Sequence, residues 1–215
     1  MPVSHKYKVV FVHIHKTAGS SIDLFMTRKD KEYGSLKNYC GKIVYSDKAI
    51  YLHHANAKDM KKQFKSVWDN YFKFSFVRNP WDRVVSEYFW RKKRKGSRYE
   101  KMEFNDFIKL IEKEFEIGNF KYIYPPQCTY LIDDNNNILV DYVGRYERLK
   151  KDFAKVSKIA KIPKGVLPWE KKTSRNRDYK SYYTKETKDV ISKCYEKDID
   201  VFKYSFNENK RFDLL

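Results

Sequence analysis

The strongest constraint on the fold is an apolar, β-rich run that gives way to helical spacing through a turn of small residues. Residues 7–14 form this run and are suited to a buried strand. Ile22, Phe25 and Met26 then recur at the spacing of one helix face, which predicts a helix that begins near Ser20. The first third of the chain is therefore expected to contain a strand, a tight turn and a helix.

The same succession returns in the second third of the chain. Residues 71–77 alternate Phe with Lys73 and Ser75, which is typical of a strand. Asn79 is a good N-cap and Pro80 a good first helical residue, so a helix is expected over residues 80–94.

The remaining elements continue this alternation. Helices are predicted over residues 103–117 and 184–202, and a third strand over residues 139–143, with a helix of period 3.6 behind that strand. Strands that alternate with helices favour an α/β fold, here a P-loop-like three-layer α/β/α arrangement with a central parallel sheet. Since we find no repeat and no linker rich in Pro, Gly or Ser, we expect a single domain over residues 1–215.

Composition narrows the class of protein. The chain is 41% hydrophobic and 17% aromatic, which is enough for a sizeable core, and it has no apolar stretch long enough to span a membrane. Residues 1–8 lack the apolar centre of a secretory signal, so we expect a soluble, cytoplasmic protein. Three widely spaced cysteines, Cys40, Cys128 and Cys194, predict neither a disulfide framework nor a cysteine zinc site.

The net charge of +18 invites an anionic partner. Nucleic acid, an acidic lipid surface, a polyanionic glycan and a phosphorylated cofactor all fit this charge. A solvated basic surface explains it equally well, and residues 92–98 are expected to be an exposed basic helix end and loop.

The turn after the first strand has the composition of an anion site. The first amide groups of a helix are unpaired and its dipole favours negative charge, while Lys16 adds a full positive charge and Gly19 allows close approach. Ser20 and Ser21 offer hydroxyl groups beside those amides. The consensus GxxxxGK[ST] is absent, which disfavours ATP with magnesium, and an ordinary strand-to-helix turn remains the alternative.

A second anion site is predicted where the second strand ends. Arg78 stands at the carboxyl edge of the sheet, where open α/β folds bind ligands, and Ser86 lies about 9 Å further up the helix. Arg83, Ser86 and Trp90 would share one helix face, opposite an apolar face that includes Tyr88. Arg83 would either contact the ligand or pair with an acid such as Asp82 or Glu87.

Taken together, these motifs resemble a known family. HIHKTAGSS from His13 and FSFVRNPWDRVVSEY from Phe74 are similar to the two nucleotide motifs of sulfotransferases that use 3′-phosphoadenosine 5′-phosphosulfate (PAPS). The resemblance is greatest to the carbohydrate branch that includes heparan sulfate 2-O-sulfotransferase, whose first motif resembles HIPKTGGTS. It extends to a HATA-like element from His54 to Ala57, to residues 143–147 and to the loop over residues 172–183. His15 replaces the usual Pro of the first motif and Ala18 a usual Gly.

The resemblance implies an enzyme that moves the sulfuryl group of PAPS to a hydroxyl group, with adenosine 3′,5′-bisphosphate (PAP) as the product and no metal. Lys16 and its loop would hold the 5′-phosphosulfate, Arg78 and Ser86 the 3′-phosphate, and the late loop would close on the nucleotide, although that loop could be a plain basic surface. The implied cofactor-binding residues are Lys16, Thr17, Ala18, Gly19, Ser20, Ser21, Arg78, Ser86, Lys172, Thr173 and Arg175.

Two residues are expected to carry the chemistry. Lys16 would stabilise charge on the leaving phosphate, and His54, through its match to the HATA-like element, would accept the proton of the attacking hydroxyl. His53 is the competing base, and a carboxylate such as Glu87 or Asp59 is a further alternative. Zinc binding by the histidines near His13 and His54 is disfavoured, because no carboxylate or cysteine stands at ligand spacing.

The acceptor and two other function classes stay open. A carbohydrate is expected as acceptor, although a small metabolite or a tyrosyl hydroxyl would fit the same chemistry. Loops over residues 35–49, 91–102 and 120–127 would select the acceptor, with Trp90, Tyr99, Tyr122 and Tyr124 available to stack on sugar rings or to fill the core. The alternatives are a P-loop-like nucleotide kinase and a basic nucleic-acid-binding module, for which no signature is present, so we expect no nucleic-acid partner.

Overall fold

The structure is a computed structural model that describes residues 3–32, 42–45, 48–51, 54–120, 123–168, 175–176 and 178–208. The chain divides into two compact units. The first unit comprises Met1–Val77, Gln127–Glu170 and Lys210–Leu215, and the second comprises Arg78–Pro126 and Lys171–Asn209. Each unit is described by itself, and the single domain expected from the sequence stays a prediction.

The first unit is built on a four-stranded sheet. Its strands are β1 (Val3–Ser4), β2 (Val9–Val12), β5 (Phe72–Val77) and β6 (Tyr142–Arg145), in the order β1-β2-β5-β6. The three longer strands are parallel, and β1 is an antiparallel edge strand. An α/β fold with a mostly parallel central sheet is therefore confirmed.

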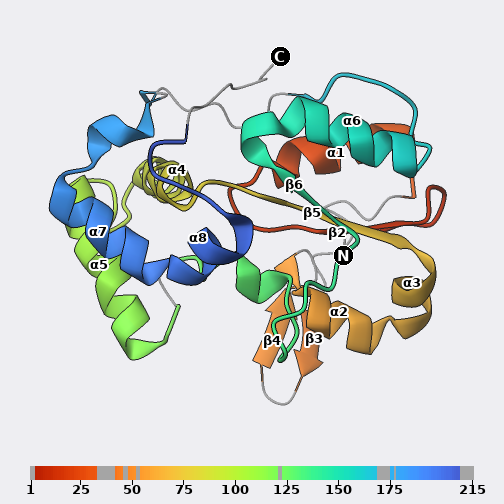
Figure 1. Cartoon of the computed structure of the whole chain (residues 1–215), viewed down its shortest axis with the longest axis horizontal. Coiled ribbons are helices and arrows are strands. Elements are labelled where there is room, and N and C mark those ends of the chain that lie inside the picture. The colour runs from red at the N-terminus through yellow and green to blue at the C-terminus, as the bar shows by residue number, and fades with distance from the viewer. Residues whose placement is uncertain are drawn as a thin grey trace. The chain divides into compact units, whose positions relative to one another are not determined.

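Helices cover both faces of this sheet. Helices α1 (Gly19–Lys29) and α6 (Leu149–Ile159) lie on one face, and α2 (Ala57–Gln63) and α3 (Lys65–Asn70) lie on the other, next to a hairpin of β3 (Lys42–Tyr45) and β4 (Lys48–Tyr51) (Figure 1). Two 3₁₀ turns, η2 (Cys128–Tyr130) and η3 (Tyr146–Arg148), complete the unit. Helix α2 begins at Ala57, where the HATA-like element ends.

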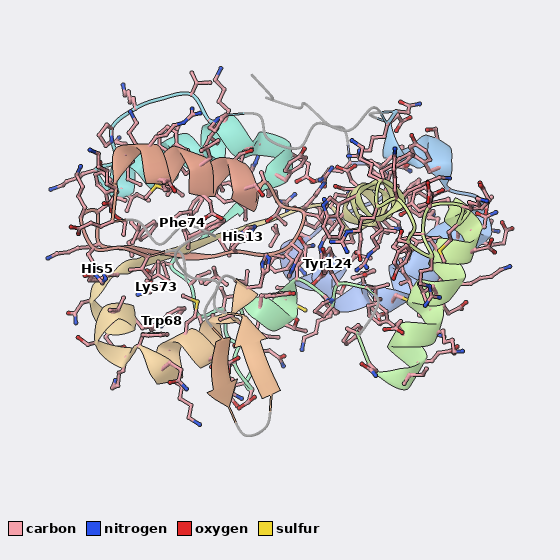
Figure 2. All side chains as sticks on the ribbon, turned by 180° about the vertical axis from the view of Figure 1, so that it is seen from behind. His5, His13, Trp68, Lys73, Phe74 and Tyr124 are labelled. Atoms are coloured by element: carbon pink, nitrogen blue, oxygen red, sulfur yellow. The ribbon has the colours of Figure 1, made fainter. Side chains whose placement is uncertain are left out.

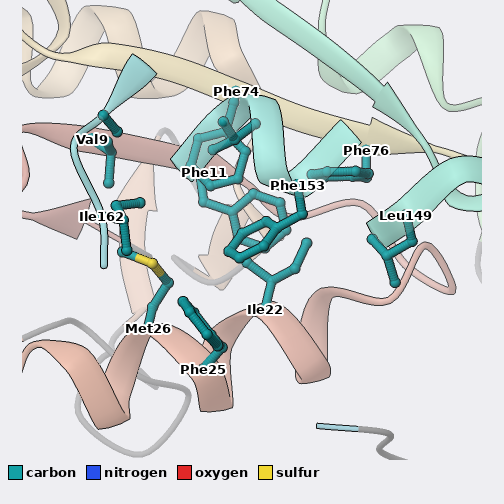
Figure 3. Close-up of a cluster of buried hydrophobic side chains, with 12 residues drawn as sticks. Val9, Phe11, Ile22, Phe25, Met26, Phe74, Phe76, Leu149, Phe153 and Ile162 are labelled. Carbon is teal, nitrogen blue, oxygen red and sulfur yellow. The ribbon is translucent and has the colours of Figure 1, made fainter. Parts of the chain in front are cut away.

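The core of the first unit explains why these segments fold as they do. Phe74 and Phe76 on β5 are fully buried and pack with Phe11 against side chains of α1 and α6 (Figure 3). Ser75, on the other face of the strand, donates a hydrogen bond to the carbonyl of Val12 at 2.7 Å. Because alternate residues of a strand face opposite ways, the Phe residues reach the core and Lys73 and Ser75 do not.

The second unit is helical. Its helices are α4 (Pro80–Lys92), α5 (Phe104–Ile117), α7 (Lys185–Cys194) and α8 (Glu196–Phe202), with a 3₁₀ turn η4 (Tyr179–Tyr182) before α7. Helices α5 and α7 lie side by side (Figure 1). Asn79 caps α4 by accepting a hydrogen bond from the amide of Asp82, and Pro80 is the first helical residue, as expected.

The last helix differs from the prediction. The expected helix over residues 184–202 is divided at Tyr195, whose backbone (φ −109, ψ 24) belongs to neither α7 nor α8. The Tyr195 side chain is buried, packs on Phe115 and donates a hydrogen bond to the carbonyl of Tyr124 at 3.1 Å. These tertiary contacts are absent from the local pattern, which reads as one helix.

Two other boundaries shift. The third strand begins at Tyr142 and not at Leu139, because the amide of Leu139 donates a hydrogen bond to the carbonyl of Leu131 and keeps that segment in a turn. Residues 35–49, expected to be a loop, contain β3 and the beginning of β4. We found no helix in the described ranges with the length and apolar character needed to cross a bilayer.

Candidate functional site

The loop after β2 has an unusual backbone. Lys16 and Ala18 both adopt positive φ angles, 68° and 74°, which side-chain-bearing residues avoid. Between them, the buried Thr17 side chain donates a hydrogen bond to the carbonyl of Ile14 at 2.9 Å. This bond holds the loop closed, while Lys16 on its outside is half-buried.

The first turn of α1 has the features of an anion site. The carbonyl of Ala18 accepts hydrogen bonds from the amides of Ser21 and Ile22 at 3.0 and 3.2 Å. Within this described segment no side chain caps the helix and no carboxylate lies in its first turn. The positive end of the helix dipole therefore adds to the charge of Lys16, a combination that favours a bound anion.

Gly19 is required by the packing behind the loop. A Cβ atom at this position would lie 1.7 Å from Nε2 of His13, which is 6% exposed at the end of β2 (Figure 2). On its other side, Nδ1 of His13 lies 3.3 Å from a carboxylate oxygen of the buried Asp23 of α1. The His13 ring thus packs against the loop and fixes the entry into the helix.

His54 is brought to the same end of β2. Its Nδ1 lies 3.0 Å from the backbone carbonyl of His13. Because a carbonyl oxygen only accepts, this hydrogen bond requires the proton on Nδ1 and leaves Nε2 as the basic nitrogen of the neutral ring. The neutral His54 ring can therefore accept a proton at Nε2.

His15 lies against His54. The two ring centroids are 3.4 Å apart with an interplanar angle of 24°, and Nδ1 of His15 lies 3.2 Å from the hydroxyl of Tyr130. Stacked rings direct their nitrogen lone pairs sideways and not toward a shared centre. In the part of the chain that the structure describes, no group of three or more His, Cys, Asp or Glu side chains could hold a metal ion.

The second unit contains a buried group of charges at the beginning of α4. One carboxylate oxygen of Asp82 accepts a hydrogen bond from Nε of Arg78 and the other accepts one from Arg175, both at 2.9 Å. Arg78 is 3% exposed and Asp82 is fully buried. A single carboxylate therefore orients two of the arginines that the sequence analysis selects.

The residues further along α4 are more buried than expected. Ser86 is only 7% exposed, and Arg83, expected on an open face, is buried and donates a hydrogen bond to the carbonyl of Pro125 at 3.0 Å. Glu87, an expected partner of Arg83, pairs with Arg91 at 2.7 Å. The face expected to be polar therefore packs against other segments of the same unit.

The aromatic candidates for acceptor binding fall into two groups. Tyr99 is 7% exposed and belongs to the core. Trp90 and Tyr124 are half-buried, and the guanidinium of Arg94 lies 3.9 Å from the centre of a Trp90 ring. Lys172, Thr173, Tyr122 and His53 lie outside the described residues.

Comparisons with known proteins identify the family of this chain. A sequence model of the sulfotransferase family matches residues 1–205. The chain belongs to the sulfotransferase family. An uncharacterized protein of Archaeoglobus fulgidus is 36% identical to the sulfotransferase over 101 residues, which cover 46% of this chain and 75% of the relative.

A solved structure has the same fold. Mouse sulfotransferase SULT7A1, crystallised in complex with PAP, superposes with a TM-score of 0.57 over 94% of this chain and 91% of that chain, at 14% identity. At this identity the match shows the fold alone. The family match confirms the enzyme class that the motifs predict, a sulfotransferase.

Sequence reasoning missed Asp23 and Tyr130 of this sulfotransferase and named Asp82 only as a possible partner of Arg83. Asp23 supports His13, Tyr130 contacts His15, and Asp82 joins Arg78 to Arg175. Asp82 had a local signal, since it stands four residues after Arg78 on a helix, where the two side chains meet. Tyr130 had none, because it is 115 residues from His15 along the chain.

Proposed function

We propose that this protein transfers the sulfuryl group of PAPS to a hydroxyl group of a carbohydrate or a related acceptor. The observation that carries the proposal is the loop before α1, where Lys16 stands beside an uncapped helix N-terminus without a carboxylate in its first turn, within the segment described. Membership of the sulfotransferase family supports the reaction class. The carbohydrate acceptor follows from the resemblance of the two motifs to the carbohydrate branch.

The loop residues fit the 5′ end of the cofactor. They offer only donors to an anion: the ammonium of Lys16, the hydroxyl of Ser20 and the first amides of α1. PAPS, when bound, supplies the sulfuryl group for transfer. Lys16 and the amides would then stabilise the negative charge that gathers on the phosphate oxygen, an effect that accelerates the reaction because this charge is greatest in the transition state.

Residues of the second unit fit the 3′-phosphate. Arg78, Ser86 and Arg175 are assigned to it, and Asp82 keeps both guanidinium groups in fixed orientation. A planar guanidinium recognises phosphate through paired hydrogen bonds, so fixed orientation favours binding. SULT7A1 was crystallised with PAP, which supports the same nucleotide here.

His54 is assigned as the general base. With its Nδ1 proton directed to the carbonyl of His13, its Nε2 can accept the proton of the acceptor hydroxyl, a role that contributes about 10²- to 10⁴-fold in rate. The alternative carboxylates are engaged elsewhere: Glu87 is paired with Arg91, and Asp59 accepts a hydrogen bond from Asn56.

The first experiment tests the nucleotide. We would titrate the purified protein with PAP by calorimetry at two salt concentrations, with AMP and magnesium-ATP as controls. Micromolar binding of PAP, about −8 kcal/mol, without binding of AMP supports a 3′-phosphate site. Equal binding of ATP would favour a nucleotide kinase, and salt-sensitive binding of nucleic acid with no binding of PAP would favour the nucleic-acid module.

The second experiment tests the acceptor. We would incubate the protein with ³⁵S-labelled PAPS and, separately, with desulfated heparin, desulfated chondroitin, a tyrosine peptide and p-nitrophenol. Label in a glycan supports the carbohydrate assignment. Label in the peptide or in p-nitrophenol alone would keep the sulfotransferase and reject the carbohydrate.

A further inference from the structure

Three imidazole rings are in contact at the end of β2, and His54 is the middle one. Its ring centroid lies 4.7 Å from that of His13, at an interplanar angle of 58°, and 3.4 Å from that of His15, at 24°. The contact with His15 is face to face, whereas the contact with His13 is tilted. His15 therefore covers one face of the His54 ring.

His15 is itself held in place. The hydroxyl of Tyr130 lies 3.2 Å from its Nδ1, and Tyr130 is only 8% exposed. The 3₁₀ turn η2 fixes Tyr130, since its amide donates to the carbonyl of Gln127 at 3.1 Å. Tyr130 thus holds the edge of the His15 ring at Nδ1, while one face of that ring stacks on His54.

We infer that His15 is a positioning residue for His54: held by Tyr130, its ring sets the plane of the His54 imidazole in which Nε2 accepts the proton. The hydrogen bond at Nδ1 fixes one direction of the ring, and rotation about that direction is limited by what packs on the ring faces. A flat partner stacked on one face removes that freedom. The inference rests on the proposed role of His54 as the base.

The stacking of His15 on His54 also affects how the two rings take up protons. Two protonated imidazoles at this separation repel, so the pair takes up its protons in two separate steps. Protonation of either ring makes protonation of the other less favourable, so loss of the His15 nitrogens should raise the pH at which His54 takes up its proton. The other titratable and charged groups around the pair are His13, Asp23, Tyr130 and Lys16.

The test separates two effects of His15 on His54: the packing of its ring and the charge that it can carry. We would label the histidines with ¹³C, assign His54 through His54→Gln, and follow its ring resonance by NMR from pH 5 to 9. His15→Phe keeps a flat ring that cannot be protonated, and Tyr130→Phe removes only the hydroxyl that holds His15. The matched control is His5→Phe, because His5 also contacts a tyrosine hydroxyl, that of Tyr71 at 2.8 Å, at the other end of the sheet (Figure 2).

We expect a two-step titration of His54 in the wild-type protein. In His15→Phe it becomes a single step, moved to higher pH by about one pH unit, because the competing charge is gone. Tyr130→Phe broadens the His54 resonance, and His5→Phe leaves it unchanged. A His54 resonance that stays as narrow in Tyr130→Phe as in wild type would overturn the positioning of His54, and an unchanged His54 titration in His15→Phe would overturn the charge coupling.

Measurements of turnover show whether the role of His15 or the proposed function fails. With ³⁵S-labelled PAPS and the acceptor found above, the acid limb of kcat/KM should move to higher pH in His15→Phe, and His15→Ala should lower kcat at least tenfold without weakening PAP binding. If the NMR coupling is present but no acceptor is sulfated, the pairing stands and the proposed function fails. If sulfation occurs and His15→Ala turns over as fast as wild type, the role of His15 fails alone.

Discussion

Ala18 shows at the scale of one residue how this sulfotransferase departs from the motif that it resembles. It holds a φ of 74° where the related motif has Gly, and a left-handed backbone is unfavourable for a residue with a Cβ atom. The neighbouring His15, in place of Pro, supplies the ring that stacks on His54. The two departures from the motif thus have different consequences, one for stability and one for the candidate base.

We expect Ala18→Gly to stabilise the protein. Glycine removes the cost of the left-handed conformation but gains entropy in the unfolded chain, so the net gain in the free energy of unfolding is about 0.5–1 kcal/mol. Urea unfolding measures it. Ala154→Gly, at an exposed position of α6, is the matched control and should destabilise by about 1 kcal/mol. Destabilisation by both changes would contradict the role of the backbone conformation.

Lys16→Ala should lower turnover far more than nucleotide affinity. The Lys16 charge stabilises the transition state, in which negative charge gathers on the leaving oxygen, more than the bound cofactor. The loss in kcat is therefore expected to be about 10²- to 10³-fold. Steady-state kinetics with PAPS and calorimetry with PAP separate the two effects. The control is Lys164→Ala, an exposed lysine of the same unit. Wild-type turnover in Lys16→Ala would remove the loop from the proposed mechanism.

At the scale of the element, the two helix N-termini that follow β2 and β5 differ in their capping and in their first-turn charges. Helix α1 has no side-chain cap and no acid in its first turn, within the described segment, whereas α4 is capped by Asn79 and carries Asp82. The first arrangement leaves the helix dipole available to an anion. In helix α4 the positive end of the dipole stabilises the buried Asp82 carboxylate, which orients Arg78 and Arg175.

Asp82→Asn should destabilise the protein strongly. It removes the buried negative charge that two arginines share, and breaking a buried ion pair costs about 3–5 kcal/mol. Asp106→Asn is the matched control, since Asp106 also stands in the first turn of a helix but is exposed with its partner Lys109, and its loss should cost at most about 0.5 kcal/mol. Urea unfolding compares the two variants, and equal losses would show that Asp82 is no more important than a surface acid.

At the scale of the whole molecule, half-buried weak acids make stability depend on alkaline pH. Burial raises the pKa of Tyr142 to about 12 and that of Cys194 to about 11, in each case because the charged form is poorly solvated. In the unfolded chain these groups lose their protons at lower pH. Their contribution to stability is therefore fully present below their ordinary pKa values and is lost as pH rises toward the folded values.

We expect the free energy of unfolding to fall between pH 10 and pH 12 for this reason. Tyr142→Phe removes one of the groups and should flatten the fall. The measurement is the urea midpoint of wild type and variant at pH 9, 10 and 11, with the difference between them as the readout. A difference that stays constant over this range would rule out Tyr142 as a source of the pH dependence.

Local pattern was sufficient for most elements. The strands near residues 7–14 and 71–77, the helices that follow them and the cap at Asn79 were predictable because their signals are neighbours in sequence. The same holds for Lys16 and Arg78 as candidates, since each stands where a strand ends. Residue identity alone also led to the sulfotransferase family, because its two motifs are short and continuous.

Only the tertiary structure decided which side chains support these candidates. The break at Tyr195, the pairing of Asp82 with Arg175 and the contact of His15 with Tyr130 join residues far apart in the chain. Burial of Arg83 is of the same kind, because a helix pattern cannot show which segment packs over a polar face. The sequence by itself determined the main alternation of strands and helices and the chemistry of the two motifs, which depend on local spacing. The contacts that orient His54 and Arg78 depend on how distant segments pack.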